Sequence, residues 1–305
     1  MRDLEGAAEA SRRCGFVALI GAPNAGKSTL VNRLVGAKVS IVTHKVQTTR
    51  TRLRGIMMSG QSQIILVDTP GIFEPKKKLE RAMVESAWGG VEDADLSALI
   101  VDSRAGLSEA TEHIVAGLEG AGRKAVLCLN KIDTLRRDKL LAIAQTMNER
   151  FAFDATFFIS AQTGEGLADL ERHFAAAVPE GPWLYPEDQV ADAPMRFLAA
   201  EVTREKIFVR LHQELPYSST VETESWKEQK DGSVRIEQVI FVQRESQRKI
   251  VLGKGGQTIK EIGRQARVEL QETLERPVHL FLFVKVRENW TEDPERYRQM
   301  GLELS

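Results

Sequence analysis

Short apolar runs alternate with stretches of helical periodicity up to about residue 178. The runs are four or five residues long and lie at 16–20, 64–67, 125–129 and 155–159. Runs of this length between helical stretches are typical of strands that are buried on both faces. The pattern therefore predicts an α/β domain over residues 15–178, in which helices cover both faces of a mostly parallel sheet, preceded by an extension over residues 1–14.

A different pattern begins after residue 178. Residues 179–194 hold four of the ten prolines of the chain, which is typical of a semi-rigid linker. The elements predicted beyond the linker are a helix, two strands, two helices and a final strand, which indicates a separate α+β domain with a C-terminal tail over residues 195–305. Their expected positions are a helix with Met195, Leu198, Val202 and Val209 on one face, strands at Val221–Glu228 and Ser233–Arg244, and a last strand at His279–Val286.

The segment after the first apolar run indicates a phosphate-binding loop. Residues 21–28 read Gly-Ala-Pro-Asn-Ala-Gly-Lys-Ser and lead into a predicted helix. Glycine lets backbone N–H groups converge on phosphate oxygens, Lys27 can reach the β and γ phosphates, and Ser28 can offer its hydroxyl to Mg²⁺. The helix N-terminus also favours anions. We expect this loop to bind nucleotide through Asn24, Ala25, Gly26, Lys27, Ser28 and Thr29.

Three later segments, each at the end of an apolar run, complete a guanine-nucleotide site. They contain Asp68 and Gly71, then Asn130, Lys131 and Asp133, and finally Ser160 and Ala161. Asp68 can hold Mg²⁺ through water, and the Gly71 N–H can reach the γ phosphate. The Asp133 carboxylate can accept hydrogen bonds from N1–H and the 2-amino group of guanine, and adenine lacks both donors. The last segment adds a backbone N–H for the guanine O6.

These segments resemble the translation-factor-type GTPases and, within them, the Era family, and the resemblance runs from Phe16 to the C-terminus. It assigns Gln47–Arg50 to the first switch, where one threonine binds Mg²⁺ and senses the γ phosphate. Thr49 is the expected ligand, and Thr48 is left open. The metal ligands would then be Ser28, Thr49 and Asp68.

The resemblance also implies a catalytic arrangement for GTP hydrolysis, in which Lys27, Thr49, Asp68 and Gly71 position the triphosphate. Ile72 stands where many GTPases carry a glutamine that orients water, so we expect slow intrinsic hydrolysis. Asn24 matches an asparagine that helps hold K⁺ in related GTPases. K⁺ is therefore a candidate second cation, and the alternative is a side chain that only stabilises the loop.

The second domain contains a G-x-x-G loop, Gly253-Lys254-Gly255-Gly256, between two predicted helices. In this order of elements it resembles the type II KH fold of the C-terminal domain of Era, in which the nucleic-acid backbone approaches the glycines closely. Residues 244–267 hold seven Lys or Arg against two acids, as expected of a surface that faces phosphates. The expected RNA contacts are Gly253, Lys254, Gly255, Gly256, Lys249, Lys260 and Arg264, and the alternative for any one of the basic residues is a solvated helix face.

Composition and charge limit the kinds of binding partner and the compartment that fit this chain. A formal net charge of −1 excludes a globally basic nucleic-acid binder, so any RNA contact is local. Cys14 and Cys128 are expected to be buried free thiols in a reducing cytoplasm. No apolar run approaches the ~18 residues of a membrane-spanning helix. We expect a cytoplasmic monomer, and peripheral contact with the cytoplasmic face of the cell membrane is left open.

The resemblance implies a function that joins the two domains. The chain would bind GTP or GDP with Mg²⁺, hydrolyse GTP, and bind the 3′ region of small-subunit ribosomal RNA in a nucleotide-dependent way during assembly of the small ribosomal subunit. Two alternatives remain. One is a membrane-peripheral signalling GTPase whose basic patch binds acidic lipid, and the other is a constitutive RNA-binding module in which GTP is only structural.

Overall fold

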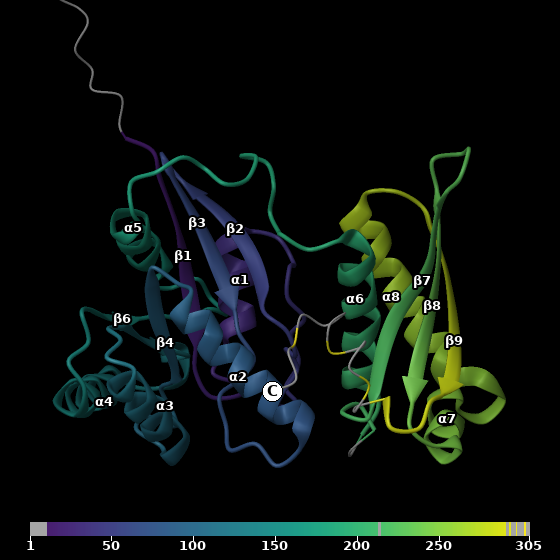
Figure 1. Cartoon of the computed structure of the whole chain (residues 1–305), viewed down its shortest axis with the longest axis horizontal. Coiled ribbons are helices and arrows are strands. Elements are labelled where there is room, and N and C mark those ends of the chain that lie inside the picture. The colour runs from purple at the N-terminus through teal and green to yellow at the C-terminus, as the bar shows by residue number, and fades with distance from the viewer. Residues whose placement is uncertain (1–10, 213–214, 291–292, 294–296, 298–301, 303–305) are drawn as a thin grey trace, which may run out of the picture.

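The apolar runs of the first domain pair into a six-stranded sheet in the order β2-β3-β1-β4-β5-β6 (Figure 1). The structure is a computed structural model and describes residues 11–212, 215–290, 293, 297 and 302. Neighbouring strands are parallel except β2 and β3, which confirms the mostly parallel sheet. The strands are β1 (Arg13–Ile20), β2 (Leu53–Ser59), β3 (Ser62–Asp68), β4 (Leu96–Asp102), β5 (Val126–Asn130) and β6 (Thr156–Phe158).

Helices cover both faces of this sheet, as the alternating pattern predicted. They are α1 (Lys27–Val35), α2 (Lys78–Glu92), α3 (Glu109–Gly120), α4 (Arg137–Arg150) and α5 (Leu167–Ala177), with a 3₁₀ turn at Ile132–Thr134. Helices α1 and α5 bury Leu30 and Leu170 against one face, and α3 and α4 bury Ile114 and Met147 against the other. Burying a large apolar side chain contributes about 1.5–3 kcal/mol. The carboxyl ends of parallel strands meet at one edge of a sheet, so the loops that follow β1, β3 and β5 lie together there.

The linker packs against the first domain. Trp183 Nε1 donates to the Gln61 carbonyl at 3.0 Å, and the fully buried Gln63 donates to the Tyr185 carbonyl at 2.8 Å. Further along, Ala191 forms an isolated bridge with β2. These contacts fix the point at which the chain enters the second domain.

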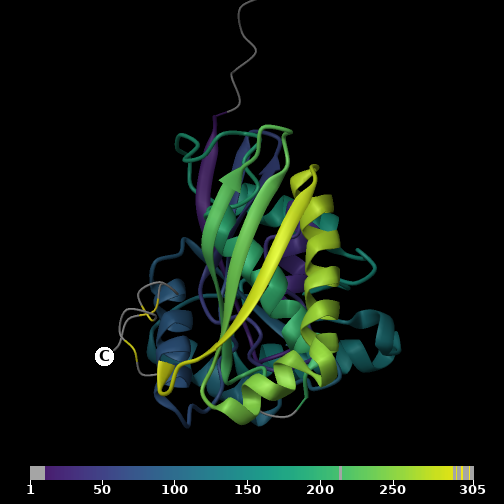
Figure 2. The ribbon, with the colours of Figure 1, turned by 90° about the vertical axis from the view of Figure 1, so that its right-hand side faces the viewer.

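The second domain has the predicted order of elements. They are α6 (Met195–Arg210), β7 (Ser219–Glu228), β8 (Val234–Val242), α7 (Glu245–Leu252), a 3₁₀ turn at Lys254–Gly256, α8 (Gln257–Leu274) and β9 (Val278–Val286). The sheet order is β7-β8-β9, and its outer face is uncovered by helices (Figure 2). Strands β8 and β9 are parallel and therefore require the crossover that α7 and α8 supply.

Helix α6 differs from its prediction in the face that it buries. Met195 and Val209 were expected on the buried face, but they are 49% and 58% exposed. The fully buried Ile207 and Phe208 occupy the interior instead. The reason is tertiary, because α6 lies between its own sheet and the first domain and therefore buries side chains on more than one side (Figure 1). None of the helices in the described ranges combines the length and apolarity needed to cross a membrane.

Candidate nucleotide site and nucleic-acid interface

The predicted phosphate-binding loop joins the carboxyl end of β1 to the first residue of α1. Gly26 has φ 102°, and a Cβ there would lie 2.2 Å from the Asn130 Nδ2 atom. A Cβ on Gly21 would lie 2.3 Å from the Ile100 carbonyl oxygen. Only glycine fits at these two positions, so the loop can approach both β4 and the Asn130 loop closely. The backbone N–H groups at the start of α1 are then directed at whatever occupies the loop.

Lys27 is buried inside this loop without a carboxylate among its hydrogen-bond acceptors. Its Nζ atom donates to the carbonyls of Gly21 and Ala22 at 2.9 and 3.1 Å, and the residue is only 6% exposed. Burial lowers the pKa of Lys27 to about 8, and the nearby Asp68 offsets this only in part. A buried ammonium group of this kind is suited to a polyphosphate, whose negative charge favours the protonated form.

Three hydroxyl or carboxylate oxygens meet beside Lys27, each from a different segment. Ser28 Oγ donates to Asp68 Oδ2 at 2.7 Å and lies 3.0 Å from Thr49 Oγ1. Thr49 Oγ1 is also 3.4 Å from Asp68 Oδ2. Asp68 is fully buried, which raises the pKa of its carboxyl group, and within the described part of the chain its Oδ1 atom lacks a hydrogen-bond partner. Hard oxygen donors with one unused carboxylate oxygen fit Mg²⁺.

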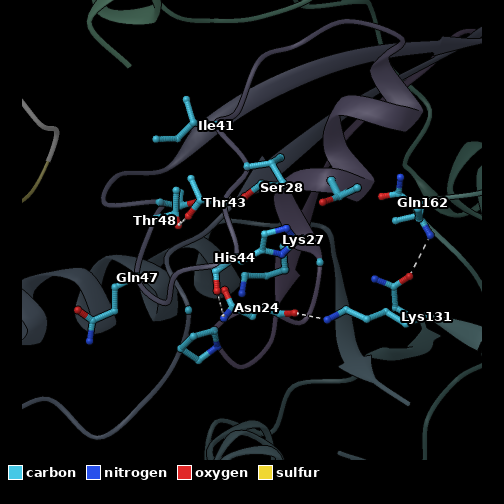
Figure 3. Close-up of a pocket in the computed structure, with 18 of the residues that line it drawn as sticks. Asn24, Lys27, Ser28, Ile41, Thr43, His44, Gln47, Thr48, Lys131 and Gln162 are labelled. Carbon is cyan, nitrogen blue, oxygen red and sulfur yellow. Dashed lines mark hydrogen bonds between the residues drawn. The ribbon is translucent and has the colours of Figure 1, made fainter. Parts of the chain in front are cut away.

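The geometry distinguishes the two threonines of the first switch. The Thr48 hydroxyl lies 2.7 Å from Thr43 Oγ1 and donates to the Lys45 carbonyl at 2.9 Å, so it is engaged within its own loop (Figure 3). The Thr49 hydroxyl, in contrast, reaches both Ser28 and Asp68. The structure thus brings Thr49, rather than Thr48, to the predicted metal position.

The guanine-binding segments are joined to the phosphate loop through Asn130. This residue is 1% exposed, its Nδ2 donates to the Ala25 carbonyl at 2.8 Å, and its Oδ1 accepts the Ala161 N–H at 2.9 Å. Lys131 Nζ donates to the Asn24 carbonyl at 2.7 Å (Figure 3). Asp133 is exposed at the wall of a cavity of about 470 Å³ that the phosphate loop, the switch and these segments share. The cavity can therefore hold phosphates at Lys27 and a base at Asp133.

Gly71 and Thr29 line the same cavity, Ser160 is buried, and Ile72 lies in the core. Gly71 lies against Pro23, so that a Cβ there would be 2.9 Å from the proline ring. Thr29 lines the cavity, and Ser160 is fully buried behind it. Ile72 is fully buried and donates its N–H to the Gly21 carbonyl at 3.2 Å, so its side chain belongs to the core and cannot orient water.

Sequence reasoning missed Asp102, which holds Lys131. Its Oδ2 atom accepts from Lys131 Nζ at 2.8 Å, and Arg104 binds the same carboxylate. Burial alone would raise the pKa of Asp102, but these two cations hold it far below its ordinary value. A signal was available, because Asp102 ends the apolar run of β4 in the way that Asp68 ends β3.

The G-x-x-G loop lies between α7 and α8, as predicted. Gly253 and Gly256 have φ 74° and 77°, and a Cβ on Gly253 would lie 2.2 Å from Thr258 Oγ1. The space around Gly255 and Gly256 is open. The loop therefore has the conformation and the access that a nucleic-acid backbone needs.

The predicted RNA-contacting side chains surround this loop on exposed positions. Lys249, Lys254, Lys260 and Arg264 are all exposed, and Arg264 pairs with Glu261 at 2.7 Å. The adjacent groove, about 800 Å³ in volume, has Val209 and Ile250 among its lining residues, which are 58% and 56% exposed. A groove that exposes apolar side chains among polar ones, beside a basic glycine loop, suits unstacked bases whose phosphates lie on the loop.

The chain is similar to known proteins over nearly its whole length. Family models match at residues 16–131, for a 50S ribosome-binding GTPase, and at residues 214–291, for a KH domain. GTPase Era of Afipia carboxidovorans is 66% identical over 292 residues, which are 96% of this chain and 95% of the relative. GTPase Era of Bradyrhizobium diazoefficiens is 62% identical over 302 residues, which are 99% of this chain and 98% of the relative.

Two solved structures share both domains with this chain. One is a variant of Aquifex aeolicus Era bound to GDP·AlF4⁻, and the other is Era in complex with MgGDPNP and nucleotides 1506–1542 of 16S ribosomal RNA. Each superposes with a TM-score of 0.90 at 38% identity and covers 95% of this chain and 99% of the matched chain.

Proposed function

Because the chain belongs to the Era family of GTPases, we propose that it acts in small ribosomal subunit assembly by binding the 3′ region of small-subunit ribosomal RNA in a nucleotide-dependent way. The chain is a GTPase with a KH domain. The RNA assignment is supported by the solved Era complex with 16S ribosomal RNA and by the basic glycine loop. The small-subunit assignment rests on that complex alone. The family model of the first domain is described as a 50S ribosome-binding GTPase and therefore does not support a small-subunit role.

In the first domain the residues position GTP and Mg²⁺. Lys27 binds the β and γ phosphates, and the Gly71 N–H donates to the γ phosphate. Ser28 and Thr49 would ligand the cation and Asp68 would hold it through water, because the side-chain oxygens of the three residues lie together. Mg²⁺ would supply positive charge that offsets the negative charge of the phosphates during transfer. Asp133 selects guanine by accepting from its two donors.

We infer that Asn24 helps bind K⁺ beside the phosphates. Its Nδ2 atom donates to the His44 carbonyl at 3.1 Å, so the amide faces a carbonyl of the segment before the first switch, and both residues line the cavity (Figure 3). With the amide turned over, Oδ1 and this carbonyl would offer two oxygen ligands to a cation. Hydrolysis should then be faster in K⁺ than in Na⁺, and Asn24→Ala should erase the difference. Equal wild-type rates in the two salts would remove K⁺ from the mechanism.

The observation that carries the nucleotide dependence is that the first switch contacts both domains. Thr49 belongs to the Mg²⁺ site, and the next residue, Arg50, is 5% exposed and donates to three carbonyls of the second domain. These carbonyls belong to Ser219 at 2.9 Å, Tyr217 at 3.0 Å and Pro216 at 3.3 Å. Ordering of the switch around a γ phosphate therefore changes a surface on which the RNA-binding domain rests.

The test is a titration of a single-stranded fragment from the 3′ end of small-subunit ribosomal RNA. The protein would hold GDP, a non-hydrolysable GTP analogue, or no nucleotide. The analogue form should bind the RNA differently from the GDP form by a factor of about 5 to 150, and linkage requires RNA to shift analogue affinity by the same factor. Identical affinities in all three states would refute the switch and favour the constitutive module.

The RNA surface itself is tested by Lys254→Asp combined with Gly255→Asp. These changes add repulsion and bulk at the phosphate backbone, so RNA binding should be lost while GTP binding is kept. Lys230→Asp, in the β7–β8 turn, also reverses the charge of a lysine in this domain and serves as the control. If the double variant bound RNA as the control does, the KH loop would not be the RNA site.

We propose a cytoplasmic monomer. The basic patch leaves a membrane role as the competing proposal, in which the second domain binds acidic lipid. Pelleting with vesicles that contain phosphatidylserine, with and without competing RNA, separates the two. Retention on vesicles that RNA does not displace would favour the membrane role.

A further inference from the structure

Helix α6 of the second domain contacts the first switch through a buried arginine. Arg204 is 2% exposed, and its Nη2 atom donates to the Thr48 carbonyl at 2.7 Å. Glu201, one turn earlier, orients the guanidinium by accepting from Nε at 2.6 Å and from Nη2. The two residues that meet are 156 positions apart in the sequence. The contact therefore exists only because α6 lies against the nucleotide domain (Figure 1).

The next residue of α6 holds the other end of the same loop. Glu205 is 4% exposed, and its Oε1 atom accepts the Val42 N–H at 2.9 Å. Its Oε2 atom accepts from Lys38 and Lys206 at 2.6 and 2.8 Å. Two consecutive residues of one rigid helix thus hold the backbone of the switch loop, defined here as residues 42–50, near both of its ends.

The position of Thr49 follows from these contacts. The Thr48 carbonyl and the Thr49 nitrogen belong to one planar peptide group, so fixing the carbonyl also fixes the direction in which Thr49 leaves it. On its other side, Arg50 is held by the carbonyls after α6. Between these two anchors, the Thr49 hydroxyl lies 3.0 Å from Ser28 Oγ.

A purely stabilising role explains Arg204 poorly. Its Nη1 atom is buried and has no hydrogen-bond partner among the described residues, and burying a charged group with an unused donor costs free energy. An apolar residue would pack between the domains without this cost. The guanidinium does what an apolar residue cannot do, because it fixes a backbone carbonyl next to the metal-binding threonine.

We propose that Arg204 is a positioning residue for the GTPase reaction, through which the KH domain holds Thr49 at the Mg²⁺ site. The inference deepens the proposed function and rests on the role proposed there for Thr49. Only the triphosphate state uses Thr49, because this residue senses the γ phosphate. Loss of Arg204 should therefore weaken GTP relative to GDP, whereas a general structural defect would weaken both.

The test combines Arg204→Gln with Glu201→Gln, so that no single buried charge is left behind. The Kd of GDP should stay within about twofold, while the Kd of a non-hydrolysable GTP analogue with Mg²⁺ rises, or kcat falls, by about 10- to 100-fold, as expected for loss of a charged hydrogen bond. Arg204→Lys keeps a cationic donor and should recover part of the loss. Arg196→Gln is the matched control, because Arg196 lies on the same helix but donates to the Thr223 and Glu224 carbonyls of its own domain.

Thr49→Ala, measured beside these variants, separates the two proposals. If Thr49→Ala weakens the analogue and the Arg204 variants behave like Arg196→Gln, the positioning role is refuted and the metal site stands. If Thr49→Ala leaves analogue affinity and kcat unchanged, the role of Thr49 fails and the inference fails with it. Equal losses of GDP and analogue in the Arg204 variants, with no recovery in Arg204→Lys, would also overturn the inference.

Discussion

The Asn130 side chain joins the phosphate loop to the guanine loops, and its removal should damage both stability and nucleotide binding. Asn130→Ala deletes the donor to the Ala25 carbonyl and the acceptor of the Ala161 N–H, and both partners are buried. A buried group that loses its partner costs about 1–3 kcal/mol, so the two together should destabilise the nucleotide domain by about 2–6 kcal/mol. For a domain of this size, Tm falls by about 2–4 °C per kcal/mol. A loss of about 3 kcal/mol therefore corresponds to a Tm lower by about 6–12 °C.

The assay is thermal unfolding of the nucleotide-free protein, monitored by circular dichroism. Asn148→Ala removes the same side chain from an exposed position on α4, where the amide donates to the Ala144 carbonyl and to Thr156 Oγ1, and it should change stability by less than about 0.5 kcal/mol. Asn130→Ala should also weaken GDP and GTP equally, because the contact lies away from the γ phosphate. If the Tm of Asn130→Ala matched that of Asn148→Ala, Asn130 would not be the residue that joins the phosphate loop to the guanine-binding loops.

Three further predictions concern single side chains. Asp133→Asn should weaken GTP binding on the order of 10⁴-fold. It should improve binding of xanthosine triphosphate, because the 2-oxo group of that base then meets an amide donor. Full GTP affinity in a fluorescent-nucleotide titration would exclude Asp133 from the base site. Cys14 and Cys128 are buried, and burial raises the pKa of both thiols, so a disulfide reagent should modify them only after unfolding; rapid labelling of the native protein would contradict this. Burial alone would raise the pKa of Glu205, but Lys206, Lys38 and the Val42 N–H lower it below its ordinary value of 4.5. The ionised Glu205 therefore stabilises the fold above pH 4.5, and this stabilisation is lost as the pH falls below that value. Glu205→Gln should therefore flatten the dependence of stability on pH below about 4.5, and an unchanged acid profile would argue against this role.

The sequence alone was sufficient for the parts of the protein whose geometry is local. Gly26 and Gly253 stand where no Cβ fits, and a short glycine-rich segment encodes that conformation within a few residues. The apolar runs predicted the sheet, and because parallel strands bring their carboxyl ends to one edge, the residues after them had to meet. The order of these runs and the residues that follow them therefore suffice to assign the phosphate loop, Asp68, Asn130 and the Ser160–Ala161 segment to one site.

The tertiary structure decided which side chains act across distance. Thr48 and Thr49 are adjacent and chemically alike, and only the folded loop directs the Thr49 hydroxyl to Ser28. Met195 and Val209 fit the spacing of one helix face and were therefore predicted to lie on the buried face. That prediction was wrong because α6 packs against two partners rather than one core. Arg204 carries no signal in the sequence, since an isolated arginine on a helix usually marks a solvated face. Its role depends on a carbonyl 156 residues away, and only the packing of the two domains brings that carbonyl within hydrogen-bond distance.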